Sequence, residues 1–106
     1  MSNDGAGWIE EGVMTVLKQE LEITEKAGYF LPGNIIKPLT VAEQNGNLVL
    51  YFQTDVDPLE ISKSPKKYIQ IFIVGTGRKG DNIIYADYLG TVVMSYGLVC
   101  HCYIRQ

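Results

Sequence analysis

Two β-forming runs separated by an Asn-Gly turn constrain the fold of this chain more than any other feature. The runs are residues 36–43 and 48–53, and Gln44-Asn45-Gly46-Asn47 lies between them. Asn-Gly is strongly preferred where both central residues of a two-residue hairpin loop need a positive φ. The sequence therefore predicts an antiparallel hairpin over residues 36–53.

Further β-forming runs follow in the second half of the chain. Residues 67–74 alternate with a period of two and are largely apolar on both faces, which is typical of a central strand. Residues 83–85 resume the β pattern, 90–94 make another strand and 98–104 make the last one. These segments predict a sheet built mostly from short strands.

Turn-forming segments separate the strands. Phe30-Leu31-Pro32-Gly33-Asn34 is interpreted as a turn, residues 54–66 as a long polar loop with two prolines, and Ser95-Tyr96-Gly97 as a tight connection. An α/β fold would need helices between the strands. We therefore predict a mainly β fold, a compact antiparallel sheet arranged as a small sandwich or barrel-like structure, with at most one short helix.

The N-terminal residues divide into a tail and an ambiguous segment. Residues 1–7 are small and polar, so we expect a flexible tail. From Trp8 to Ile23 the apolar residues fit either a helical face or a strand face, and β-branched residues favour a strand from about Thr15. A chain of 106 residues suits one core. We predict a single β domain over residues 8–106.

The charge distribution excludes one large class of partners. The net charge is −3, and residues 1–25 carry six acidic side chains against the single Lys18. Duplex nucleic acid is bound through a broad cationic face, so we do not expect it as a partner. The apolar runs are far shorter than the roughly 20 residues that cross a bilayer, and no secretory signal is present. We expect a cytosolic protein without a membrane partner.

A glycine-rich motif follows residues 67–74. Residues 75–80, Gly-Thr-Gly-Arg-Lys-Gly, match the G-x-G-x-x-G string of dinucleotide-binding folds. That mechanism requires a helix after the glycines, whereas turn-forming and then β-forming residues follow here. A glycine loop that carries Arg78 and Lys79 still offers N–H groups and cations to a phosphate. The competing interpretation is an exposed loop whose charges serve solubility.

The last predicted strand places its side chains on two faces. Cys100 and Cys102 share one face with apolar neighbours, whereas His101, Tyr103 and Arg105 lie on the other. His101, the only histidine, therefore points away from both thiols, so we expect neither a metal site nor a Cys–His catalytic pair. The thiols are predicted to be reduced and buried. We expect no enzyme activity, no metal and no cofactor.

Several short motifs follow one another in a definite order. They are Leu21-Glu22-Ile23-Thr24, Phe30-Leu31-Pro32-Gly33, Val41-Ala42-Glu43-Gln44-Asn45-Gly46, Leu48-Val49-Leu50-Tyr51, Asp55-Val56-Asp57-Pro58, Phe72-Ile73-Val74-Gly75-Thr76-Gly77, Tyr88-Leu89-Gly90-Thr91 and Gly97-Leu98-Val99-Cys100-His101. With these motifs the chain resembles, over about residues 15 to 104, a family of small bacteriophage-encoded β domains of unassigned function. It departs from that family in its longer N-terminus and in Arg78-Lys79, where a histidine and an apolar residue are expected.

The resemblance implies a phage accessory protein with a compact β fold. The leading hypothesis is a non-catalytic protein that sequesters a small nucleotide immune signal, of the cyclic nucleotide or cyclic ADP-ribose type, in the cytoplasm of the infected bacterial host. Such a ligand needs cations for its phosphates and a ring to stack its base, and we expect a homo-oligomer with the pocket between protomers. The alternative is a phage structural or protein-interaction module that binds another protein through its β surface. The predicted ligand-binding residues are Thr76, Arg78, Lys79, His101, Tyr103 and Arg105.

Overall fold

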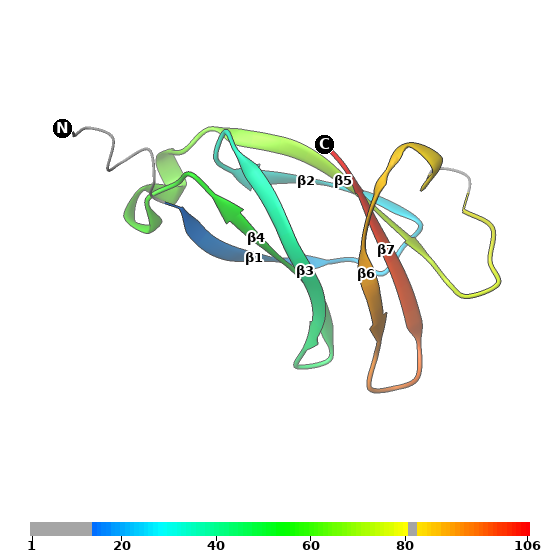
Figure 1. Ribbon diagram of the computed structural model, residues 1–106. Helices are drawn as coiled ribbons and strands as arrows, with labels where there is room; N and C mark the ends of the chain where they lie inside the picture. The colour runs from blue at the N-terminus through cyan, green and yellow to red at the C-terminus, as the bar shows by residue number, and fades with distance from the viewer. Residues whose placement is uncertain (1–13, 81–82) are drawn as a thin grey trace.

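Two antiparallel sheets pack face to face in the computed structural model, which describes residues 14–80 and 83–106 (Figure 1). The three-stranded sheet has the order β1-β4-β3 and the four-stranded sheet the order β2-β5-β7-β6. The predicted mainly β, antiparallel fold is thus confirmed. The predicted tail and residues 8–13 lie outside the described residues. The strands are β1 (Thr15–Leu21), β2 (Lys26–Pro32), β3 (Ile36–Gln44), β4 (Asn47–Thr54), β5 (Lys66–Val74), β6 (Asp87–Val93) and β7 (Val99–Arg105).

The predicted Asn-Gly hairpin joins β3 to β4. Gln44 pairs with Asn47 across the turn. The central residues Asn45 and Gly46 have φ angles of 53° and 84°. Two consecutive positive φ values characterise a type I′ turn, whose twist matches that of the flanking strands. This hairpin supplies two of the three strands of its sheet.

The predicted central position of β5 and the predicted faces of β7 are confirmed. β5 lies between β2 and β7, as expected for a strand that is apolar on both sides. On β7, Cys100, Cys102 and Ile104 are each at most 2% exposed, whereas the alternate residues are only half-buried. The strand from Thr15 onward is also confirmed as β1. The sequence pattern therefore predicted the central position of β5 and the core side of β7.

The predicted turn over residues 30–34 is wrong in its first three positions. Phe30, Leu31 and Pro32 belong to β2, and only Gly33 and Asn34 form the bend. Pro32 pairs with Lys66 at the last position of an edge strand. A proline is tolerated there because an edge strand has one side without ladder hydrogen bonds.

The predicted strand at residues 83–85 is also wrong. Ile83–Tyr85 forms a 3₁₀ helix, η2, in which the Ala86 N–H donates to the Ile83 carbonyl at 3.0 Å. Ile84 and Tyr85 are 76% and 78% exposed, so no sheet buries them. β-forming residues adopt a strand only where a neighbouring strand pairs with them. β6 begins at Asp87, opposite Ile104 of β7.

One hydrophobic core lies between the sheets. Its fully buried side chains come from both layers, with Leu50 and Phe52 from β4 and Ile69 and Ile71 from β5. A polar contact also ties the sheets together near the β3–β4 turn. The Glu43 carboxylate accepts from the Ser95 N–H at 2.7 Å and from the Ser95 hydroxyl at 2.6 Å. This bidentate contact joins the β3–β4 hairpin to the β6–β7 turn.

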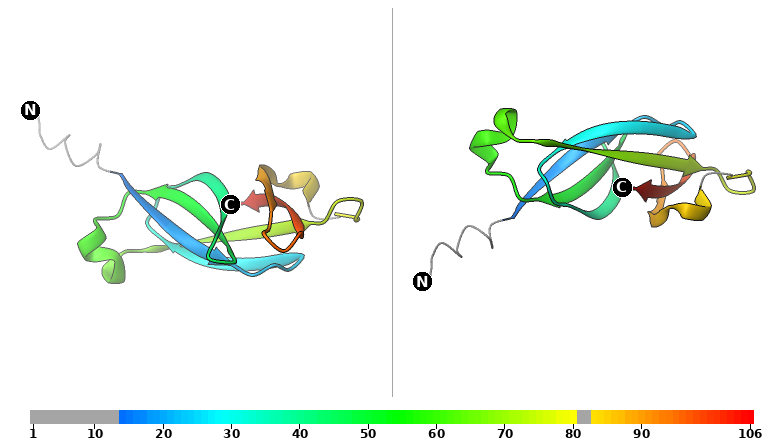
Figure 2. Two further views of the ribbon diagram at one scale, coloured as in Figure 1. Left: turned by 90° about the horizontal axis from the view of Figure 1, so that it is seen from below. Right: turned by 90° about the horizontal axis from the view of Figure 1, so that it is seen from above.

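The two longest connections lie at opposite ends of the molecule. The predicted polar loop over residues 54–66 contains a second 3₁₀ helix, η1 (Pro58–Lys63), whose first turn is capped by Asp57. Figure 2 shows η1 at one end and the loop that follows β5 at the other. No helix among residues 14–80 and 83–106 is long and apolar enough to cross a membrane.

The bend after β2 generates a testable prediction about stability. Gly33 has a φ of +116°, and a Cβ atom there would overlap the Thr54 hydroxyl, which itself donates to the Pro32 carbonyl at 2.6 Å. Gly46 has a φ of +84°, and a Cβ atom there would meet nothing within 4 Å. Gly46→Ala should cost about 1 kcal/mol through backbone strain alone, and Gly33→Ala at least about 2 kcal/mol more. Urea unfolding measures both, and equal losses would contradict the prediction.

Candidate functional site

A chain of hydrogen bonds surrounds His101 on the outer face of the four-stranded sheet. Its Nε2 lies 2.7 Å from the Thr76 hydroxyl, and its Nδ1 lies 2.8 Å from the Thr91 hydroxyl. The Thr91 hydroxyl in turn contacts the Tyr88 hydroxyl at 2.5 Å. Thr91 and His101 are direct partners in the β6–β7 ladder, which explains their contact. Both ring nitrogens of His101 are therefore occupied by neutral hydroxyl groups.

Tyr103 and Arg105 lie farther along the same face of β7. The Tyr103 ring packs edge-on against the Tyr88 ring, with centroids 5.4 Å apart. The Arg105 guanidinium lies 5.4 Å from the centroid of the Phe72 ring, and its Nε donates to the Gln70 side chain at 3.4 Å. Phe72 is only 1% exposed although it is on the outer side of the sheet. Arg105 is thus positioned by an aromatic ring and an amide, both neutral.

Arg78 and Lys79 line a hollow at the end of the molecule where the loop after β5 lies, which is called the loop end from here on. The hollow has a volume of about 430 Å³. Its walls come from the β1–β2 connection, the end of β5, the loop after β5 and the start of β7. The loop turns back through a hydrogen bond of 3.0 Å from the Arg78 N–H to the Gly75 carbonyl. The hollow combines two cations, one carboxylate and an apolar wall; its lining includes Ile23, Glu25, Ile73, Arg78, Lys79, Leu98 and Cys100.

The six predicted site residues fall into three groups. Thr76 and His101 are joined by a hydrogen bond, Tyr103 and Arg105 lie along the outer face of β7, and Arg78 and Lys79 line the hollow. Sequence reasoning named neither the Tyr88–Thr91 pair as part of this network nor Glu25 and Ile23 as walls of the hollow. No local signal identifies them, since they come from strands and connections distant in the sequence.

The two cysteines lie on the core side of β7. Both thiols are free and buried, as predicted. Burial raises the pKa of the Cys102 thiol from 9.0 to about 12, and the neighbouring Cys100 adds to the increase. Burial also raises the pKa of Cys100, which lies at the wall of the hollow. Both thiols are therefore neutral near pH 7, the form with little nucleophilic character.

A family model described as a domain of unknown function (DUF7352) matches residues 13–106. The chain belongs to this family. The match includes all seven strands of the described residues and the hollow at their end. A family of unassigned function is also what the sequence motifs indicated. No curated protein and no solved structure matches this DUF7352 domain.

The buried thiols of the DUF7352 domain predict a loss of stability at high pH. The pKa of the Cys102 thiol is higher in the folded state, at about 12, than in the unfolded chain, at 9.0. Its contribution to stability is therefore complete below pH 9.0 and is lost as the pH rises toward about 12. The free energy of unfolding should fall between pH 8 and pH 10.5, and the fall should be smaller in Cys102→Ala, which lacks the thiol.

Urea titrations of both proteins at the two pH values measure this difference. The comparison within each protein cancels the cavity that Cys102→Ala creates, and it cancels the titration of the tyrosines and lysines that both proteins share. An identical fall in the two proteins would contradict the assignment. As a second measurement, neither thiol of the folded protein should react with iodoacetamide at pH 8, whereas both should react in urea.

Proposed function

We propose that this DUF7352 domain is a non-catalytic binding protein that holds a small anionic ligand of nucleotide size in the hollow at the loop end. The observation that carries the proposal is the position of Arg78 and Lys79, adjacent cations of a glycine loop, at the wall of a hollow of about 430 Å³. Ligand sites in proteins commonly have volumes of roughly 300 to 1,000 Å³. A nucleotide has a matching size and charge.

The composition of the walls supports the same class of ligand. Arg78 and Lys79 would contact phosphate oxygens, for which charge-assisted hydrogen bonds are strong. Ile23, Ile73 and Leu98 line the hollow as well and offer apolar contact to a base or ribose. The Glu25 carboxylate, also at the wall, is a suitable acceptor for hydroxyl or amino groups.

Binding without chemistry is supported by the state of the reactive groups. Cys100 supplies a thiol to the lining of the hollow, and burial holds this thiol in the neutral form by raising its pKa. His101 bonds Thr76 and Thr91 through its two nitrogens, so neither nitrogen is directed at the hollow as a base. General base catalysis needs a group within hydrogen-bond reach of the substrate proton. We therefore propose that the ligand is released unchanged.

The resemblance to phage-encoded domains suggests a biological role for such binding. A protein of this kind, made in an infected bacterium, would sequester a cyclic nucleotide or cyclic ADP-ribose signal of the host's immune response. The hollow is only partly enclosed, so a second copy of the chain could complete it, and we include a homo-oligomer in the proposal. Sequestration requires tight binding but no turnover.

The decisive measurement uses a panel of cyclic nucleotides and cyclic ADP-ribose isomers with the purified full chain. At least one ligand should raise the melting temperature and be recovered intact after denaturation, because the proposal includes binding and excludes reaction. Absence of a shift for every ligand would contradict the proposed function. Recovery of an altered ligand would contradict the non-catalytic part.

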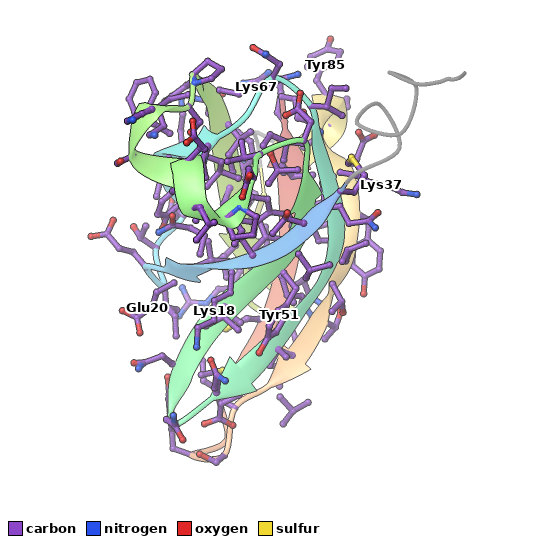
Figure 3. All side chains as sticks on the ribbon, turned by 90° about the vertical axis from the view of Figure 1, so that its left-hand side faces the viewer. Lys18, Glu20, Lys37, Tyr51, Lys67 and Tyr85 are labelled. Atoms are coloured by element: carbon purple, nitrogen blue, oxygen red, sulfur yellow. The ribbon has the colours of Figure 1, made fainter. Side chains whose placement is uncertain are left out.

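Charge reversal at the loop tests the site itself. The double variant Arg78→Glu with Lys79→Glu should weaken binding at least about 100-fold, because two charge-assisted contacts are replaced by repulsion. The matched control is Lys18→Glu with Lys37→Glu, which changes the net charge equally on the three-stranded sheet (Figure 3). Titration calorimetry measures both. Equal losses in the two variants would show a general charge effect in place of a site.

A further inference from the structure

The outer face of the four-stranded sheet, here called the platform face, carries side chains from four strands. Residues paired directly in an antiparallel ladder point to the same side of the sheet. This face therefore consists of the even-numbered residues of β2 and β5 and the odd-numbered residues of β7. The pairs that show this are Phe30↔Tyr68, Gln70↔Arg105 and Phe72↔Tyr103. Tyr88 joins the same face as the partner of Tyr103.

Three aromatic rings on the platform face are exposed. Phe30, Tyr68 and Tyr88 are 68%, 48% and 60% exposed. Exposed apolar side chains that lie next to one another form patches, and such patches often mark sites of interaction. The Phe30 and Tyr68 rings form a tilted pair with centroids 5.1 Å apart, and the Tyr88 and Tyr103 rings form a T-shaped pair farther along the face.

The Tyr68 ring extends over Gly28 of the neighbouring strand β2. A Cβ atom built on Gly28, the adjacent residue of β2, would be 2.6 Å from Cε1 and 2.7 Å from Cζ of Tyr68. The ring therefore covers the position that a side chain at residue 28 would occupy. Tyr68 is nevertheless 48% exposed, so about half of its surface is open to solvent. That geometry is suited to stacking of a planar group such as a nucleic acid base.

The charge on the platform face has one sign. Its strand positions carry Lys26, Lys66 and Arg105 and no Asp or Glu, although the whole chain has a net charge of −3. The contacts described for Lys66 and Arg105 are to neutral oxygens and a neutral ring. By contrast, the outer face of the three-stranded sheet mixes Lys18 and Glu20 beside Tyr51 (Figure 3). The platform face is thus complementary to a polyanion.

The two aromatic pairs are separated by a length suited to a short linear ligand. Tyr68 and Phe72 are four residues apart on β5, and three strand spacings separate β2 from β6. Strand geometry then places Phe30 and Tyr88 about 20 Å apart on a diagonal, with Arg105 between them. Single-stranded nucleic acid is bound by other sheet proteins in this manner, through stacked bases and backbone cations.

We propose that the platform face binds single-stranded nucleic acid, with bases stacked on Tyr68 and Tyr88 and phosphates at Lys26, Lys66 and Arg105. This activity is separate from the hollow proposed above, which uses other side chains. A duplex keeps its bases paired and stacked inside, so it cannot use the rings. The platform face therefore distinguishes single strands from duplexes of the same charge.

Fluorescence anisotropy with labelled 12-nucleotide oligo-dT and oligo-U tests the proposal on the full chain. Binding should be saturable for at least one of them, weaker for a duplex of equal length, and weaker at 200 mM than at 50 mM salt. Comparison of oligo-dT with oligo-U shows whether DNA or RNA is preferred. Absence of binding to both at low salt would overturn the proposal, even if the chain instead self-associates through this face.

Side-chain variants place the binding on this face. Tyr68→Ala and Tyr88→Ala should each weaken binding by about 5- to 100-fold, the loss expected for one stacked base. Tyr96→Ala is the matched control, because Tyr96 is 61% exposed but lies in the β6–β7 turn. Circular dichroism checks that each variant is folded, and the exposure of all three rings makes unfolding an unexpected result.

Two outcomes in these variants would overturn the proposal. Equal losses in Tyr96→Ala and Tyr68→Ala would show that the face has no special role. Loss of oligonucleotide binding only in Arg78→Glu with Lys79→Glu would assign it to the hollow. If the chain binds oligonucleotides as described but binds no cyclic nucleotide, the proposed function is contradicted and the present proposal is not.

Discussion

The packing of the two sheets through the inward side chains of β4, β5 and β7 is the interaction on which the rest of the structure depends. Phe52 from one sheet and Ile69, Ile71 and Cys102 from the other are almost completely buried. Burial of such side chains supplies most of the favourable free energy of folding. Because side chains alternate along a strand, directing these residues inward also directs Tyr68, Phe72 and Tyr103 outward. The core thereby determines what the platform face displays.

The outer faces of the two sheets differ in a way that burial does not require. One mixes charges of both signs around Tyr51, as a solvated surface usually does. The other combines exposed rings with cations and contains no carboxylate at its strand positions. Phe30 and Tyr88 each contact a second ring, which stabilises the sheet, but most of their own surface stays exposed, and this exposure is what the proposed binding would use. The hollow beside the loop after β5 has cations of its own, Arg78 and Lys79.

Three segments show where local sequence patterns predict the structure and where they do not. Asn45-Gly46 specified its hairpin because the required positive φ angles are a property of those two residues. The turn predicted at Phe30-Leu31-Pro32 was wrong, because a proline, which breaks most strands, is tolerated at the end of edge strand β2. The strand predicted at residues 83–85 was also wrong, because these β-forming residues have no partner strand and form a 3₁₀ helix instead.

The sequence by itself determined the β class, the Asn-Gly hairpin and the two faces of β5 and β7, including the buried thiols. These follow from backbone preferences and from period-two alternation, which act within a few residues. Only the tertiary structure decided that Tyr88 lies beside Tyr103, that His101 lies between two threonines, and that the loop cations meet the β1–β2 connection. Such neighbours depend on which strands pair, and pairing is selected by burial summed over the whole core, which no single segment encodes.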